Sequence, residues 1–249
     1  LPNTLLEGSF SQQERVNFSL RLAEPATFAY KKNRWEGTQL ELSTSQSKDG
    51  QSVSAVVQLA SKGQQWGTLK ATEDLSVTIF WKDNQINFRS GLVLHESLQQ
   101  ASLEGQAVLL DSTIEIVLTP AQEVLPDSQW QVHPENCITL GKSWARFQNF
   151  VFRKGQQQVS LEGTLSADPA EMLHLKVKDC SLENFNLLVS KPVTGVLNAA
   201  AVLQGTLDQL YMNSDINFEK LTIDNFLVGD IHVKTSWNNI LRRLNIACQ

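Results

Sequence analysis

The residues that could carry out catalysis are few and lie far apart along the chain. The sequence has four histidines, at His95, His133, His174 and His232. It contains no HExxH metal motif, no phosphate-binding GxxxxGK or GxGxxG loop, and no GxSxG nucleophile turn. Asp179 and Glu183 are interpreted as surface charges rather than as the carboxylate pair of a glycosidase. We therefore expect a protein that is not an enzyme and that binds no metal and no cofactor.

The cysteines do not indicate a disulfide scaffold, because there are only three of them and no CxxC pair. Cys137, Cys180 and Cys248 are each expected to act as a small, buried or half-buried hydrophobic residue. A bridge between Cys137 and Cys180 is the alternative in an oxidising compartment, although two thiols on strands seldom meet the geometry that a disulfide requires.

Composition narrows the class of protein further. The chain has 249 residues and a mild formal net charge of −5. No basic stripe is present, so the electrostatic footprint of a nucleic-acid binder is missing. No run of about 18 apolar residues occurs, so no transmembrane helix is expected. The chain begins with Leu-Pro-Asn and ends within a strand-like pattern, and we expect it to be a piece of a longer protein.

The stretch from Val193 to Trp237 shows what kind of elements the chain forms. Its apolar residues recur at every second position, as in Leu197, Ala199, Ala201 and Leu203. Glycines and short polar turns such as Asp224-Asn225 separate the extended pieces. A period of two is typical of strands with one buried face. This stretch is therefore expected to form successive strands with one apolar face and one wet face.

The same alternation predicts strands in the rest of the chain. It runs through residues 16–22, through a meander at residues 53–88 that follows an Asp49-Gly50 hairpin turn, and through residues 173–177. Residues 168–171 are expected to form a turn, with a short helical piece as an option. Residues 238–246 could form a helix, but a hairpin turn at Asn238-Asn239 is preferred because asparagine tolerates positive φ.

A short phrase with glycine in its third position recurs along the chain and indicates a β-rich repeat array. It reads Leu-Glu-Gly-Ser, Trp-Glu-Gly-Thr or a close variant, and its glycines are Gly8, Gly37, Gly67, Gly105, Gly163 and Gly205. Two prolines between residues 120 and 129 mark a connection. The expected organisation is an N-terminal part at residues 1–119, a connection at 120–129 and a C-terminal part at 130–249.

Several motifs resemble the TamB family, the translocation and assembly module subunits, within the AsmA-like group of bridge-like lipid transfer proteins. The motifs are the runs at residues 130–140 (WQVHPENCITL), 147–150, 158–163, 205–207, 217–226, 229–231 and 236–238. The resemblance is strongest from about Trp130 to the end of the chain.

The resemblance implies an elongated, curved, antiparallel all-β sheet with little helix, folded into an open trough called a β-taco. It also implies an inner-membrane anchor outside this chain, a location in the periplasm, and transport of phospholipid between the inner and outer membranes. The implied partners are phospholipid acyl chains and, through the full-length protein, an outer-membrane barrel of the TamA type that takes part in protein assembly and secretion.

The residues expected to line the apolar groove come from the alternating strands of the C-terminal part. They are Val159, Leu161, Leu165, Leu173, Leu175, Val177, Leu197, Ala199, Ala201, Leu203, Ile216, Phe218, Ile231 and Val233. The same alternation would arise if another sheet packed against this face. The alternative function is accordingly a secreted or surface β-solenoid, an adhesin or structural protein with a closed, dry core. A third reading is a β-helical polysaccharide-cleaving enzyme, which would need Asp, Lys and Arg side chains gathered on one face.

Overall fold

The computed structural model describes residues 5–67, 71–94, 100–119, 130–186, 189, 191–206, 209–238 and 243–248. Within them the chain is all-β, with eighteen strands and one short 3-10 helix. Every strand pairing is antiparallel, and the pairings leave the sheet open. The predicted all-β, antiparallel, open-sheet fold with little helix is therefore confirmed. The described residues contain no helix long and apolar enough to cross a membrane.

The chain divides into two compact units between Leu109 and Leu110. The connection predicted at residues 120–129 lies outside the described residues. Unit 1 contains β1 (Leu6–Gln12), β2 (Arg15–Leu22), β3 (Ala26–Tyr30), β4 (Asn33–Ser47), β5 (Val53–Trp66), β6 (Thr72–Lys82), β7 (Gln85–Leu94) and β8 (Gln100–Leu109).

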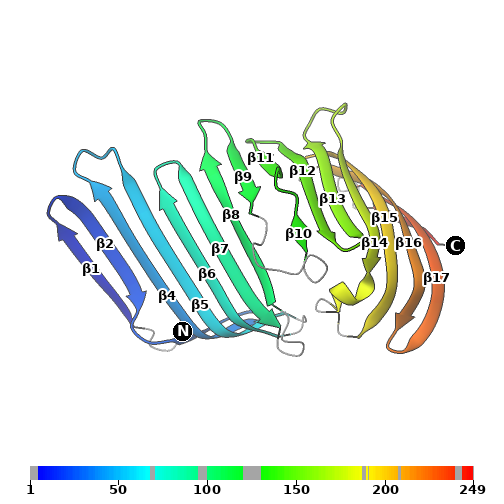
Figure 1. Cartoon of the computed structure of the whole chain (residues 1–249), viewed down its shortest axis with the longest axis horizontal. Coiled ribbons are helices and arrows are strands. Elements are labelled where there is room, and N and C mark those ends of the chain that lie inside the picture. Colours follow the sequence, from blue (N-terminus) through cyan, green and yellow to red (C-terminus); the bar gives the residue numbers. More distant parts are fainter. Residues whose placement is uncertain are drawn as a thin grey trace. The chain divides into compact units, whose positions relative to one another are not determined.

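Unit 1 is a meander in which neighbours in sequence are mostly neighbours in the sheet (Figure 1). The long strand β4 takes two partners on one side, since β3 pairs with its first half and β2 with its second half. The predicted hairpin at Asp49-Gly50 joins β4 to β5, and the predicted meander at residues 53–88 is β5, β6 and β7.

Unit 2 contains β9 (Ile114–Leu118), β10 (Gln131–Val132), β11 (Cys137–Leu140), β12 (Ala145–Lys154), β13 (Gln157–Leu165), β14 (Leu173–Ser181), the 3-10 helix η1 (Leu182–Phe185), β15 (Val193–Gly205), β16 (Leu210–Ile223), β17 (Phe226–Asn238) and β18 (Arg243–Cys248). From β12 to β18 each strand pairs with the next. β18 pairs with β17, so the strand expected at the end of the chain is confirmed in place of a helix. Asn238, expected in the turn, belongs to β17, and residues 239–242 lie outside the described residues. Residues 168–171 form a turn without the optional helical piece.

Short turns form where the sequence has residues that tolerate positive φ. Asp224 and Asn225, between β16 and β17, have φ values of 51° and 64°. Two successive residues with positive φ make the tight hairpin turn whose twist matches that of the flanking strands. The predicted turn at this position is therefore present, and it brings β16 and β17 into register.

Bulges that contain a residue with positive φ interrupt β12, β14 and β16 of unit 2. Asn149 in β12, Asp179 in β14 and Lys220 in β16 have φ values of 49°, 49° and 51°, and the register shifts at each of them. A side-chain oxygen on the following strand accepts each of their backbone N–H groups: Glu162 at 2.9 Å, Asn198 at 2.8 Å and Asp230 at 2.7 Å. Bulges bend the strand that carries them and increase its twist. β13 and β15 come close to one another across β14, and Figure 1 shows the sheet curling from β12 to β17.

Two glycines of the recurring phrase are required by a close backbone approach. Gly163 in β13 has a φ of 116°, and a Cβ built there would lie 2.1 Å from the carbonyl oxygen of Met172. Gly205 at the end of β15 has a φ of 94°, and its Cβ would lie 2.1 Å from the carbonyl oxygen of Gln209. Both positions are at a strand end where the next segment of chain crosses closely, which only glycine permits.

Candidate functional site

The strand registers of unit 2 bring all the predicted groove residues onto one face. Residues directly opposite one another in an antiparallel pair point to the same side of the sheet. The successive rows are Val159–Val177–Ala199–Ile216–Val233; Leu161–Leu175–Ala201; Leu173–Leu203; and Leu197–Phe218–Ile231. Leu165 follows Leu161 on the same side of β13. We call the surface made by these residues and their registered neighbours the apolar face of unit 2.

The registers also extend this face beyond the predicted residues. On β12 they add Phe147, Phe150 and Phe152, whose rings touch edge to face at centroid distances of 5.7 and 5.1 Å. On β18 they add Leu244 and Ile246, which remain 50% and 59% exposed. Met212 and Trp237 complete the row through Leu203. The sequence prediction missed these residues, although those on β18 follow the same alternation.

The apolar face of unit 2 is only partly buried. Among the predicted residues, Leu165, Leu173 and Ala201 are buried at 7%, 5% and 7% exposure, and the others are half-buried. Within this unit, no second sheet covers the face in the part of the chain that the structure describes. Large half-exposed apolar surfaces on soluble proteins generally mark sites of interaction.

The opposite face of unit 2 carries the charge. Lys176, Asp215 and Lys234 lie in one row across β14, β16 and β17. Asp215 accepts a 2.6 Å hydrogen bond from His232 Nε2 and lies 3.8 Å from Lys234 Nζ. His174 and His232 thus lie on the charged face of their strands. The bulge acceptors Glu162, Asn198 and Asp230 share this face, since each precedes or follows an apolar-face residue.

Helix η1 covers one end of the apolar face, where β14 turns toward β15. Asn184 Nδ2 donates to Gln157 Oε1 at 2.6 Å and approaches Cys180 Sγ at 3.8 Å. Cys180 is fully buried, Cys137 is half-buried and Cys248 is exposed, so the expected burial is wrong for Cys248. All three thiols are unbridged. Burial raises the pKa of the Cys180 thiol, and the Asn184 hydrogen bond and the charge of Lys154 oppose that rise. Because both thiols are free, the alternative bridge between Cys137 and Cys180 is not formed.

Unit 1 has an apolar face of its own, which the predicted site did not include. Its rows are Leu20–Leu42–Val57–Ile79–Phe88; Phe10–Phe18–Thr44–Ala55–Trp81–Ile86–Ala107; and Leu40–Leu59–Val77. Most of these side chains are half-buried, and Trp81 is 39% exposed. The signal was present in the sequence as the alternation of residues 53–88.

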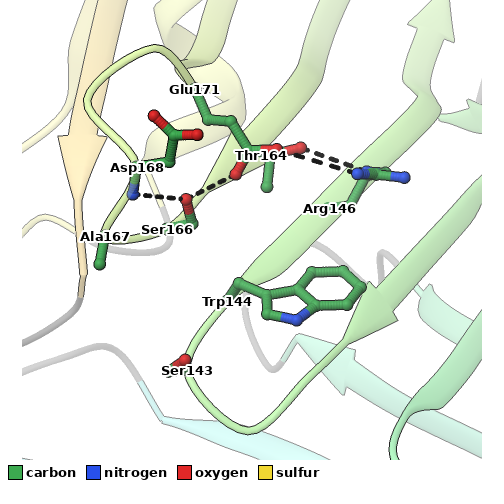
Figure 2. Close-up of a pocket in the computed structure, with 8 residues that line it drawn as sticks. All are labelled: Ser143, Trp144, Arg146, Thr164, Ser166, Ala167, Asp168 and Glu171. Atoms are coloured by element: carbon green, nitrogen blue, oxygen red, sulfur yellow. Dashed lines mark hydrogen bonds and ion pairs between the residues drawn. The ribbon is translucent and has the colours of Figure 1, made fainter.

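A polar pocket of about 360 Å³ lies on the opposite face of unit 2, between the turn before β12 and the turn after β13 (Figure 2). Arg146 lies over the Trp144 ring at 5.6 Å, donates to Thr164 Oγ1 at 3.2 Å and approaches Glu171 at 3.9 Å. Ser166 donates its hydroxyl to Glu171 at 2.5 Å and accepts the Asp168 amide at 3.0 Å. These contacts tie the turn before β12 to the turn after β13.

No metal centre forms among the described residues, which contain no group of three or more His, Cys, Asp or Glu side chains able to hold an ion. Comparisons with known protein families, with curated proteins and with solved structures find no match to this chain. The candidate site is therefore defined by its own geometry, which is a broad apolar face backed by a charged one.

Proposed function

We propose that this chain is a segment of a periplasm-spanning bridge protein that carries phospholipid between the inner and outer membranes in an apolar β-trough. The observation that carries the proposal is the division of unit 2 into two faces. The rows through Leu175 and Ile216 form an apolar face that stays half-exposed, while Lys176 and Asp215, the next residues on the other side, belong to a charged face.

Elementary energetics favours acyl chains as the occupants of such a face. Removing a methylene from water gains about 0.8 kcal/mol. A strand of nine residues such as β13 is roughly 26 Å long, and the hydrocarbon of one membrane leaflet is about 15 Å thick. One strand is therefore long enough to shelter an acyl chain along its length.

The wider setting of this proposal rests on the resemblance to the TamB family. On that reading the full-length protein is anchored in the inner membrane, works in the periplasm and supports outer-membrane biogenesis with a barrel partner of the TamA type. The chain itself acts as a binding surface and has no enzymatic role.

The alternative, a surface β-solenoid acting as an adhesin or structural protein, requires a closed and dry core. Half-buried residues such as Ile216 and Phe218 favour the open reading, because a second packed layer would remove them from water. Neighbouring residues of β16 can separate the two functions, since Ile216 lies on the apolar face and Asn217 on the opposite one.

The test is photo-crosslinking in cells, with a benzophenone amino acid placed at Ile216 or at Asn217 of the full-length protein. The proposal predicts phospholipid adducts, identified by mass spectrometry, at position 216 and few or none at position 217. Equal labelling at both positions, or adducts to protein alone at position 216, would contradict lipid transport and favour a structural role.

A further inference from the structure

One charged side chain lies at the margin of the apolar face of unit 2. Lys154 pairs with Gln157, and each lies two residues along its strand from the apolar pair Phe152 and Val159. Residues two apart on a strand point to the same side, so both Lys154 and Gln157 lie on the apolar side. Outside the bulges, Lys154 is the only charged residue that the described registers from β12 to β18 place on this face. Its position at a strand end places a cation where the apolar rows stop.

The ammonium of Lys154 has little to satisfy it within the protein. Its one hydrogen bond in the described structure runs to Asn184 Oδ1 at 3.5 Å, and no carboxylate of the described residues forms an ion pair with it. The neighbouring carboxylate on η1, Glu183, instead accepts the hydroxyl of Ser181. A lysine ammonium has three donors, so further acceptors can be taken up here.

A second donor lies beside Lys154. Gln157 Oε1 is fixed by two donors, the Ser181 amide at 2.9 Å and Asn184 Nδ2 at 2.6 Å. Its amide nitrogen, Nε2, has no hydrogen-bond partner among the described residues. The contacts that hold Oε1 therefore fix the orientation of this N–H₂ group, which belongs to the residue paired with Lys154.

We infer that Lys154 and Gln157 bind the phosphate of an anionic amphiphile whose acyl chains lie along the apolar rows of unit 2. The inference rests on the proposed function and adds to it a headgroup class and a place for that headgroup. A lysine offers a compact charge to phosphate, and a charge-assisted hydrogen bond is about twice as strong as a neutral one. The roughly 26 Å from Gln157 to Leu165 along β13 leaves room for the chains beyond the phosphate.

The experiment is native mass spectrometry of the whole chain with an equimolar mixture of dioleoyl-phosphatidylglycerol and dioleoylglycerol, which share acyl chains and differ in the phosphate. Wild type should favour phosphatidylglycerol by roughly tenfold, as expected for a hydrogen-bonded charge. Lys154→Gln should abolish the preference while still binding dioleoylglycerol, and Lys154→Arg should keep it. Lys176→Gln, on the charged face, is the matched control and should behave as wild type.

The outcomes separate this inference from the function it rests on. Binding of both lipids without preference, unchanged in Lys154→Gln, would overturn the headgroup site and leave lipid binding intact. Failure of wild type to bind either lipid would refute the proposed function and the headgroup site together. Inorganic phosphate bound by wild type and lost in Lys154→Gln, without a lipid preference, would assign the site to free phosphate and overturn the lipid assignment.

Discussion

Replacing Leu175 with glutamate should block the apolar face without unfolding the protein. Leu175 lies in the middle of a row between Leu161 and Ala201 and is half-buried. Because its side chain already reaches water, the lost burial should cost about 1 kcal/mol of folding free energy. The new carboxylate can remain hydrated by the same route, so the fold should survive.

The effect on binding should be much larger than the effect on stability. A hydrated carboxylate in the row would keep the equivalent of three methylenes of an acyl chain in water, a loss of about 2.4 kcal/mol at roughly 0.8 kcal/mol each. This corresponds to a roughly fifty-fold rise in Kd. The assay is titration with a polyene fatty acid, whose fluorescence rises in apolar surroundings, alongside circular dichroism to confirm the fold.

Lys176→Glu is the matched control, because it adds a carboxylate to the next residue, on the charged face. Its Kd for the fatty acid should stay within about threefold of wild type, since a hydrated surface charge acts weakly through water. An unchanged Kd in Leu175→Glu would refute the assignment of the apolar face. An equal rise in both variants would show that net charge, rather than the face, governs binding.

Four further predictions concern the fold that builds this face. Gly163→Ala should destabilise the protein by about 3 kcal/mol or more, because its Cβ would collide with a backbone carbonyl at positive φ. Gly155→Ala should cost about 1 kcal/mol, because a Cβ there meets nothing within 4 Å. Urea unfolding compares the two variants. Asp230→Ala should cost about 1 kcal/mol by leaving a bulge amide without its acceptor, also measured by urea unfolding. Cys180 should resist a thiol reagent that labels the exposed Cys248 rapidly. Because burial raises the pKa of Cys180 above its ordinary 9.0, the unfolding free energy should fall as pH rises above that value, and Cys180→Ala should reduce the slope.

The first three of these predictions can each be contradicted by a single result, and a slope unchanged in Cys180→Ala would contradict the fourth. Equal unfolding midpoints for the two glycine variants would show that the close approach at Gly163 is relieved at no cost. A wild-type midpoint in Asp230→Ala would show that water replaces the acceptor fully. Labelling of both thiols at the same rate in the folded protein would show that Cys180 is accessible.

The alternation of apolar residues predicted the faces of unit 2 wherever the strands are regular. Leu173, Leu175 and Val177 follow a strict period of two, and their registered partners on β13 and β15 do the same. A one-residue slip would move every side chain to the wrong face, so the pattern itself specifies the register. The groove residues drawn from these strands therefore fall together on one face.

The bulges are what the alternation could not show. Phe147 and Phe150 are three residues apart, so a strict period of two places them on opposite faces, but the bulge at Asn149 brings their rings into contact. The same displacement places Cys180 on the side of Val177. Asparagine and aspartate tolerate the left-handed region and give a weak signal for a bulge. Lys220 gives none, because its conformation is imposed by the surrounding sheet.

The position of Lys154 and Gln157 at the margin of the apolar face could not be predicted from the sequence alone. Lys154 ends a strand before a Gly155 turn, and such a lysine is ordinarily a solvated turn residue. Its place on the apolar side follows from the bulge at Asn149, which reverses the alternation of β12 from that residue onward. The contacts from Asn184 depend on a 3-10 turn of four residues, which carries too short a pattern to be predicted.

The most direct test of the central claim is native mass spectrometry of the chain purified without detergent, followed by extraction and identification of any bound molecules. An apolar face open to acyl chains predicts co-purified phospholipid, at masses that exchange when a different phospholipid is added in excess. A bare, stable protein that also fails to take up added phospholipid would contradict the account and leave the face as a surface for packing against protein.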